Sequence, residues 1–242
     1  MMSSHLNFFK HYHDFHEESA FVNPLSPNQI IALFRKYQKD LAAPIIFPAP
    51  YFVHDFTKAE ESLKSQQNAK IDLSLQPLSA FPYSIGKYDE DRSGLYTQDI
   101  FQSNESARTI HVGIDFGMPP NAPVYAMMDG QIIAQGALPS DGDYGHVIIT
   151  AHKIENFQFY ILHGHLSARS IKRFQVGDLI KKGEILAEIG NQKENGGWFP
   201  HLHLQFSCLK PKGIDLPGVV SAQDRQIALS IYFNPLSLFY DF

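Results

Sequence analysis

The sequence predicts a mainly β protein, with an antiparallel sandwich or barrel-like core and a small helical, proline-broken region at the N-terminus. From about residue 108 onward, short apolar or alternating runs follow one another without a helical pattern between them. Glycines stand between or at the ends of these runs, which is typical of turns in compact antiparallel folds. The chain also contains 19 phenylalanines and 11 tyrosines, residue types that favour strands. The expected strands are "TIHVGIDFG", "PVYAMMDGQIIAQGA", "GHVIITAHK", "FQFYILHGHLS", "EILAEIG" and "PHLHLQFS".

The first 80 residues differ from the rest and predict an accessory region wrapped on a main domain of residues 81–242, which includes a C-terminal extension. "SPNQIIALFRKYQKDL" has a serine or asparagine cap and the apolar spacing of a short helix. "AAPIIFPAPYF" is broken by prolines and predicts extended chain. "DFTKAEESLKSQQNAK" predicts a second, more polar helix. His11, His13 and His16 are interpreted as surface histidines of a mobile end rather than a metal cluster.

Composition and charge exclude several classes of protein. The net charge of −5 argues against a nucleic-acid partner. The single cysteine, Cys208, excludes an internal disulfide and a cysteine-based zinc site. No run of eighteen apolar residues predicts a membrane span, and the N-terminal residues lack a signal-peptide core, so we expect a cytoplasmic protein. Export by another route and the oligomeric state stay open.

Metal-competent side chains stand inside strands that ought to be apolar. Two residues at even spacing point to the same side of a strand, so each pair is expected to share a face. Burying several imidazoles and a carboxylate singly would cost about 1–3 kcal/mol for each unpaired group. A divalent metal removes this cost, because neutral imidazoles and one carboxylate make a zinc site with one open position. The pairs are His111 and Asp115, His146 and His152, His163 and His165, and His201 and His203.

Three stretches resemble the lysostaphin-type (LytM-like) zinc endopeptidases, which are peptidoglycan hydrolases. That family has the pattern H-x-x-x-D, then a histidine before Leu-Ser, then H-x-H. The resemblance covers roughly residues 84–210 in the right order, with the family's glycine turns between the motifs. The stretches are "HVGIDFGMPPNAPVYAMMDGQI", "YILHGHLSARSIKRFQVGDLIKKGEILAEIG" and "PHLHLQF".

The resemblance implies a role for five residues. His111, Asp115 and His203 match the three ligands of one zinc ion per chain. His165 and His201 match the two histidines that do not bind the metal, and that activate the water and stabilise the oxyanion. The two histidines of "HLH" are therefore expected to face one site and to do different work.

Three further residues are expected near this site. His163 has no counterpart in the usual family pattern, and strand parity would put it on the face of His165 as a supporting partner. Trp198 and Phe199 belong to the turn "GNQKENGGWFP", where they would wall the cleft. This turn exceeds the short glycine-serine turn of secreted members, which puts the substrate preference of those enzymes in doubt for this chain.

A narrower resemblance is to cytosolic members of the family, whose substrate is not settled. It is carried by "GKYDEDRSGLY", "DYGHVIITAH", "NGGWFPHLHLQF" and "PGVV". The first of these contains Asp89, Glu90 and Arg92, which would either line the groove or form a surface ion pair; the surface pair is the favoured interpretation.

The sequence therefore predicts a zinc metalloendopeptidase that hydrolyses an amide bond in peptidoglycan-derived peptides, with a peptide or muropeptide as partner. The alternative is a catalytically silent metal- or ligand-binding module on the same fold. Two further readings are a phosphocarrier related to the glucose-type phosphotransferase proteins and a structural β protein with incidental histidines. Metal content separates the first two from the others, and hydrolysis separates the first from the second.

Overall fold

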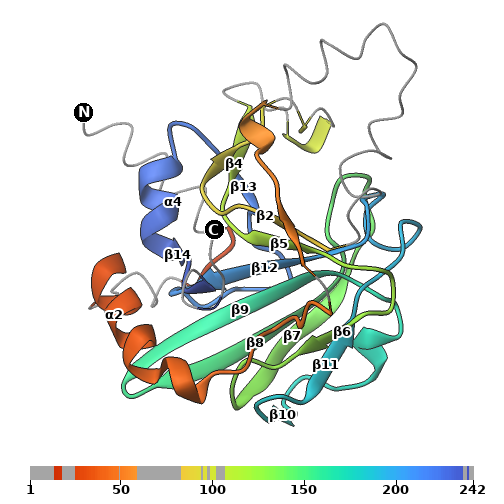
Figure 1. Cartoon of the computed structure of the whole chain (residues 1–242). Coiled ribbons are helices and arrows are strands. Elements are labelled where there is room, and N and C mark those ends of the chain that lie inside the picture. The colour runs from red at the N-terminus through yellow and green to blue at the C-terminus, as the bar shows by residue number, and fades with distance from the viewer. Residues whose placement is uncertain are drawn as a thin grey trace, which may run out of the picture.

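A large sheet, antiparallel except at one edge, forms the centre of the protein (Figure 1). The structure is a computed structural model that describes residues 14–17, 25–48, 50–58, 83–93, 95–96, 99–101, 107–236 and 239. The sheet has nine strands in the order β1-β2-β5-β12-β9-β8-β7-β10, and β14 also pairs with β12. These strands are β1 (Phe52–Val53), β2 (Ser84–Gly86), β5 (Ile114–Gly117), β7 (Gly130–Leu138), β8 (Gly145–Ile154), β9 (Phe157–Leu166), β10 (Leu179–Ile180), β12 (His201–Ser207) and β14 (Tyr232–Phe233). The predicted mainly β class is confirmed.

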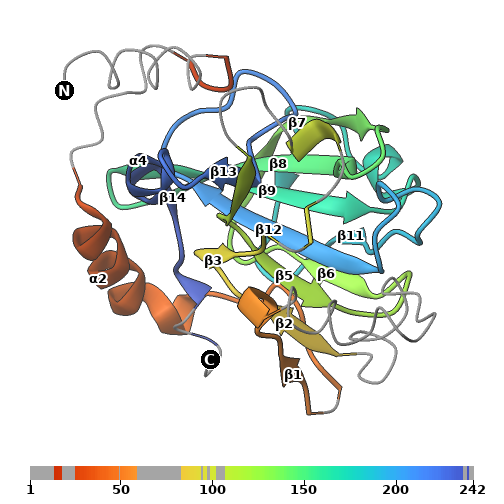
Figure 2. The ribbon, with the colours of Figure 1, turned by 90° about the horizontal axis from the view of Figure 1, so that it is seen from above.

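Two smaller sheets complete the core, and the apolar residues separate into clusters on the two faces of the large sheet. One cluster joins the large sheet to the pair formed by β6 (Pro123–Tyr125) and β11 (Ile185–Glu188). The other joins it to the sheet β13-β4-β3, made of β3 (Glu90–Asp91), β4 (Arg108–His111) and β13 (Val219–Ser221). Figure 2 shows this layered arrangement from above. We call the first the core face and the second the site face.

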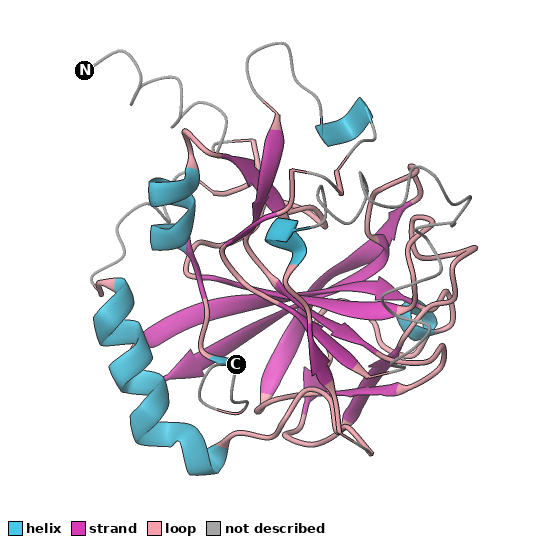
Figure 3. Ribbon diagram, turned by 45° about the horizontal axis from the view of Figure 1, so that its top comes forward, coloured by secondary structure: helices cyan, strands magenta, loops and turns pink. Residues whose placement is uncertain are grey.

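Two α-helices lie at one side of the strands (Figure 3). Helix α2 (Pro27–Tyr37) is the first helix that the sequence predicts, and Ser26 caps it through a reciprocal pair of hydrogen bonds with Gln29. Its buried Phe34 packs edge-on against Phe159 at 5.0 Å between ring centroids, on the core face. Helix α4 (Arg225–Ile231) belongs to the C-terminal extension and packs on the site face. Neither helix is long and apolar enough to cross a membrane, and the same holds for every helix in the described part of the chain.

The described parts of the N-terminal region contact the main sheet. Strand β1 pairs in parallel with β2 and so adds an edge strand to the large sheet. His16, interpreted from the sequence as a surface residue, is instead fully buried, and its Nε2 lies 2.9 Å from the Tyr232 hydroxyl. His11 and His13 lie outside the described residues, as does most of the predicted second helix. The division into residues 1–80 and 81–242 stays a prediction.

The predicted strand "TIHVGIDFG" is in fact two strands in two different sheets. Strand β4 ends at His111 and β5 begins at Ile114, so His111 and Asp115 do not share a strand as the spacing predicts. Gly113 lies at the joint, where a Cβ would stand 2.3 Å from a ring carbon of His203. The chain therefore passes from the sheet β13-β4-β3 to the large sheet at Gly113, where any larger residue would displace the ring of His203.

Candidate metal centre

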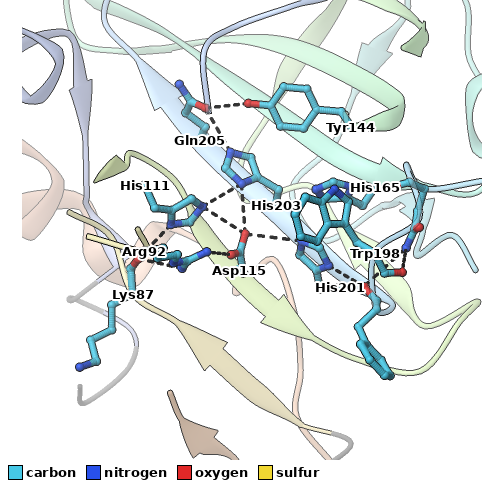
Figure 4. A network of polar contacts seen from close by, with 12 residues as sticks. Lys87, Arg92, His111, Asp115, Tyr144, His165, Trp198, His201, His203 and Gln205 are labelled. Atoms are coloured by element: carbon cyan, nitrogen blue, oxygen red, sulfur yellow. Dashed lines mark hydrogen bonds and ion pairs between the residues drawn. The ribbon is translucent and has the colours of Figure 1, made fainter. Parts of the chain in front are cut away.

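Three side chains from three strands meet between the small sheet and the large one (Figure 4). His111 comes from β4, Asp115 from β5 and His203 from β12, and one ligand atom from each lies within 4.8 Å of the others. Asp115 Oδ1 is 3.3 Å from His111 Nε2 and 3.0 Å from His203 Nδ1. Within the described residues, this is the one group of three such side chains that is arranged to hold a metal ion.

In each of the two imidazoles, the outer nitrogen, which is the one that points away from Asp115, already has a hydrogen-bond partner. His111 Nδ1 lies 2.9 Å from the carbonyl oxygen of Lys87, so Nδ1 carries the proton and Nε2 does not. His203 Nε2 lies 3.1 Å from Gln205 Oε1. The amide nitrogen of Gln205 donates to the carbonyl oxygen of Pro217, which fixes Oε1 as the acceptor, so His203 carries its proton on Nε2.

The inner atoms are therefore all acceptors. His111 Nε2 and His203 Nδ1 lie 3.1 Å apart, and both face a carboxylate oxygen. Burial, and then the Arg92 charge, lower the pKa of His111 to about 4. Burial alone would raise the pKa of Asp115, but His111 and Arg92 outweigh it and hold that pKa well below its usual value. With their outer nitrogens carrying the protons, the two neutral imidazoles and the carboxylate direct three lone pairs toward one another, an arrangement that a bound cation stabilises.

The donor set fits zinc. Two neutral imidazole nitrogens and one carboxylate oxygen are a ligand set that catalytic zinc sites use, with water in the fourth position. Histidine ligands of such sites donate their other N–H to a carbonyl or amide, as His111 and His203 do here.

Two further histidines stand beside this cluster without joining it. His201 Nε2 is 3.7 Å from Asp115 Oδ1, and His201 Nδ1 is 2.6 Å from the carbonyl oxygen of Phe199. The ring of His165 lies 4.1 Å from that of His201, and His165 Nδ1 is 2.8 Å from the carbonyl oxygen of Asn195. Burial lowers the pKa of both histidines. Each is therefore neutral near pH 7, with its Nε2 free of a proton.

A bulge in β9 turns His165 toward the site. His146 pairs with Leu166 and Ile148 pairs with His163, so β9 holds one residue more than β8 over this stretch. His165 has a φ of +61°, a conformation that a histidine adopts only where its surroundings impose it.

Because of this bulge, His163 does not share the face of His165, and the expectation that it supports the site is wrong. Its neighbour Gly164 faces the site, because a Cβ there would contact Tyr144 and His203. His163 pairs with Leu204, which belongs to the core-face cluster, and it bonds the carbonyl oxygen of Ile148 at 3.2 Å. Strand parity across "HGH" fails because the bulge lies within it.

The interpretation of Glu90 and Arg92 as a surface ion pair is also wrong. Both side chains are buried, and Arg92 Nε lies 3.0 Å from Glu90 Oε2. Arg92 Nη1 also donates to Asp115 Oδ2 at 2.6 Å. Asp89 does form a surface ion pair, but its partner is Arg225.

Two further site residues, Tyr144 and Gln205, lie within the family-like stretches but match none of the pattern's metal-binding or catalytic positions. Tyr144 packs its ring 5.1 Å from His203 and 5.7 Å from His165, and its hydroxyl lies 3.3 Å from Gln205 Oε1. Gln205 follows His203 by two residues on β12, and that spacing could have placed it on the same face.

Trp198 and Phe199 occupy different surroundings. Trp198 packs at one side of the site with Tyr96 and Phe101, at 6.1 and 6.4 Å between ring centroids. Phe199 contributes its carbonyl oxygen, which fixes the tautomer of His201. Asn195 donates to the carbonyl of Trp198 at 2.8 Å and so ties this turn together.

Part of the chain is similar to known peptidases. Residues 109–215 match the model of peptidase family M23. An uncharacterized metalloprotease of Haemophilus influenzae is 30% identical over 129 residues, which are 50% of this chain and 25% of that protein. The DD-carboxypeptidase/endopeptidase Mpg of Neisseria meningitidis is 33% identical over 114 residues, which are 45% of this chain and 23% of that protein. The chain thus spans about a quarter of the length of these curated relatives.

Solved structures add a distant likeness. One is the catalytic domain of the antimicrobial peptidase lysostaphin from Staphylococcus simulans, which is 21% identical in sequence. The overlap covers 50% of this chain and 81% of the lysostaphin chain, with a TM-score of 0.33. At so low a score, nothing about the site rests on this overlap.

Proposed function

Because residues 109–215 match the model of peptidase family M23, we propose that the chain is a zinc metalloendopeptidase that hydrolyses an amide bond in peptidoglycan-derived peptides. The observation that carries the proposal is the convergence of two imidazole nitrogens and one carboxylate oxygen, in three side chains whose outer atoms already have hydrogen-bond partners. His111, Asp115 and His203 hold one zinc ion per chain. When bound, the zinc supplies a Lewis acid that polarises the scissile carbonyl and lowers the pKa of water toward about 7.

The remaining histidines handle protons. His201 Nε2 points toward Asp115 Oδ1, so it accepts the proton from the attacking water and returns it to the leaving amine. Phe199 keeps the opposite nitrogen of His201 protonated and so holds Nε2 ready. His165, stacked on His201 and fixed in the same way by Asn195, presents a second unprotonated Nε2, which can take the water's proton in place of His201.

The substrate class rests on the relatives. Two of the proteins that the chain resembles are named for endopeptidase or DD-carboxypeptidase activity, and one of these names includes peptidoglycan. Trp198, which packs on the buried Tyr96 and Phe101, is partly exposed beside the site, where it can contact a bound peptide. The cytoplasmic location expected from the sequence stays a prediction that cell fractionation checks.

Metal analysis of the purified protein, beside Asp115→Ala, tests the proposal first. About one zinc per chain that is lost in the variant is the expected result. The loaded protein is then incubated with purified muropeptides, and mass spectrometry should detect products that have gained one water. A protein that binds zinc but cleaves neither muropeptides nor cross-linked peptidoglycan would instead be the silent binding module. A protein that takes up no metal would overturn both readings.

A further inference from the structure

The two oxygens of Asp115 have different partners. Oδ1 faces the imidazoles of His111 and His203, whereas Oδ2 accepts a hydrogen bond from Arg92 Nη1 at 2.6 Å. Figure 4 shows Arg92 at one oxygen of the carboxylate and the imidazoles at the other. A carboxylate can bind a metal with one oxygen or with both, so the partner of the second oxygen decides how many positions the metal has left for water and substrate.

Arg92 is built into the fold and does not reach the site from solvent. Arg92 is only 3% exposed, and its Nε pairs with Glu90 Oε2 at 3.0 Å. Its Nη2 donates to the carbonyl oxygen of Lys87 at 3.2 Å, and Lys87 is also the residue whose carbonyl orients His111. A planar guanidinium held by this many contacts presents Nη1 in one direction.

Further contacts hold the outer side of Arg92. Its Nη1 donates to the Tyr96 hydroxyl at 3.1 Å, and its guanidinium carbon stands 4.8 Å from the centre of the Phe56 ring. Glu90 in turn accepts the backbone N–H of Phe56 at 2.9 Å, so the counter-ion is fixed as well. The buried charge of Arg92 is thus compensated on both sides, which a buried ion pair requires.

Gly86 leaves room for the Arg92–Asp115 contact. It pairs with Asp115 across β2 and β5, and a Cβ there would stand 2.8 Å from Arg92 Nη2 and 3.2 Å from Asp115 Oδ2. A methyl group at this position would push the end of the Arg92 side chain away from the carboxylate. The sequence therefore supplies both the donor and the space in which it acts.

We propose that Arg92 is a positioning residue that makes Asp115 a one-oxygen metal ligand, by holding Oδ2 away from the metal. This inference rests on the metal centre of the proposed function. The consequence is that one coordination position stays open where a second carboxylate oxygen would otherwise bind. Removing Arg92 should free Oδ2 and should also remove a positive charge from the neighbourhood of the metal. Both changes favour a metal that is held at least as tightly as before but with more ligands.

Cobalt substitution of the full-length chain tests this, because the visible absorption of Co²⁺ falls as its coordination number rises from four. Chelator-treated wild type, Arg92→Met and Gly86→Ala are each titrated with Co²⁺, and a competing chelator then measures how tightly the metal is held. Arg225→Met is the matched control, since Arg225 makes a paired contact with Asp89 at the surface, at 2.7 and 2.5 Å. We expect the visible band of both test variants to be several-fold weaker than that of wild type, with Co²⁺ held as tightly or more tightly. The control should behave as wild type.

The outcomes separate this inference from the proposed function. An unchanged band in the test variants would overturn it, and so would a weak band with loosened metal, which is the sign of a merely structural arginine. If Arg92→Met does not fold, Gly86→Ala carries the test, because it keeps the buried guanidinium but displaces it from the carboxylate. A wild type that shows the cobalt band but cleaves no peptide would defeat the proposed function alone. A wild type that binds no Co²⁺ would defeat both.

Discussion

On the core face of the large sheet, His152 and His163 are buried singly, while on the site face four histidines surround one carboxylate. His152 bonds the carbonyl of Asp129 at 3.1 Å and the Thr150 hydroxyl at 2.7 Å, and it stacks on Phe159. Each core-face histidine is satisfied by its neighbours. The site-face histidines are satisfied only on their outer nitrogens, and their inner ones converge. Burial and residue type are the same on both faces, so the direction of the free lone pairs is what distinguishes a site from a core.

The largest expected effect divides the two histidines of "HLH". His203→Ala should remove the metal, because it deletes a ligand, and should abolish hydrolysis with it. His201→Ala should keep the metal and lower the rate of hydrolysis by about 10²–10⁴-fold, the usual contribution of a general base. Metal content and muropeptide cleavage, measured on the same preparations, check both expectations. Equal metal loss in the two variants would contradict this division of roles.

His163→Leu is the core-face counterpart in the same experiment. Because His163 faces the core and its Nδ1 bonds the carbonyl oxygen of Ile148, the variant should bind metal and cleave substrate as wild type does. Loss of metal in His163→Leu would show that this histidine supports the site after all, as strand parity first indicated.

Gly113→Ala should lower the metal affinity by displacing the ring of His203. A methyl group there would meet the His203 ring at 2.3 Å, so the ring must move and its Nδ1 would leave the position facing Asp115. We expect metal affinity to fall by at least tenfold, as chelator competition would measure. Gly213→Ala is the matched control, since a Cβ there meets nothing within 4 Å. An unaffected Gly113→Ala would mean that the joint between β4 and β5 is softer than its contacts indicate.

The sequence predicts the strands and their motifs well, because alternation and glycine turns are local properties. It predicts the first helix for the same reason, since Ser26 and Gln29 form its cap within one turn. Local rules fail where one residue changes the register. The bulge that rotates His165 looks like plain alternation in the sequence, because a bulge depends on the pairing of two strands and not on one.

The sequence predicts the burial of charge less well. The pair Glu90 and Arg92 has the composition of a solvated surface, and nothing within "YDEDRS" shows that Gly86 and Asp115 make a pocket for it. Buried charged side chains are rare in proteins, so the sequence alone favours a surface position for this pair. Only the pairing of β2 with β5 brings Gly86 beside Asp115 and so leaves room for the guanidinium at the second carboxylate oxygen.

A smaller effect is expected from acid, which should lower the unfolding free energy through His163 on the core face. Burial lowers the pKa of His163 to about 3, against 6.5 for an ordinary histidine. The folded protein therefore binds fewer protons than the unfolded chain, so the contribution is present in full above pH 6.5 and is lost as the pH falls toward 3. At pH 5 the expected loss is about 2 kcal/mol of unfolding free energy. His163→Leu should be less sensitive to acid by this amount in denaturant titrations at pH 7.5 and pH 5, both with chelator present. Equal acid sensitivity in variant and wild type would mean that His163 is protonated in the folded state.

The smallest effect tests whether the core face can be weakened without touching the site. Ser26→Ala removes the cap of α2, whose Phe34 packs on the core face, and should cost about 1 kcal/mol of unfolding free energy. Ser26→Asp keeps an acceptor for the N–H of Gln29 and should restore most of that stability. Because α2 contacts the core-face cluster and none of the metal ligands belongs to that cluster, both variants should bind metal with wild-type affinity. If Ser26→Ala lowered metal affinity in step with stability, the two faces would not be independent, and the site would depend on the whole sheet rather than on the strands that carry it.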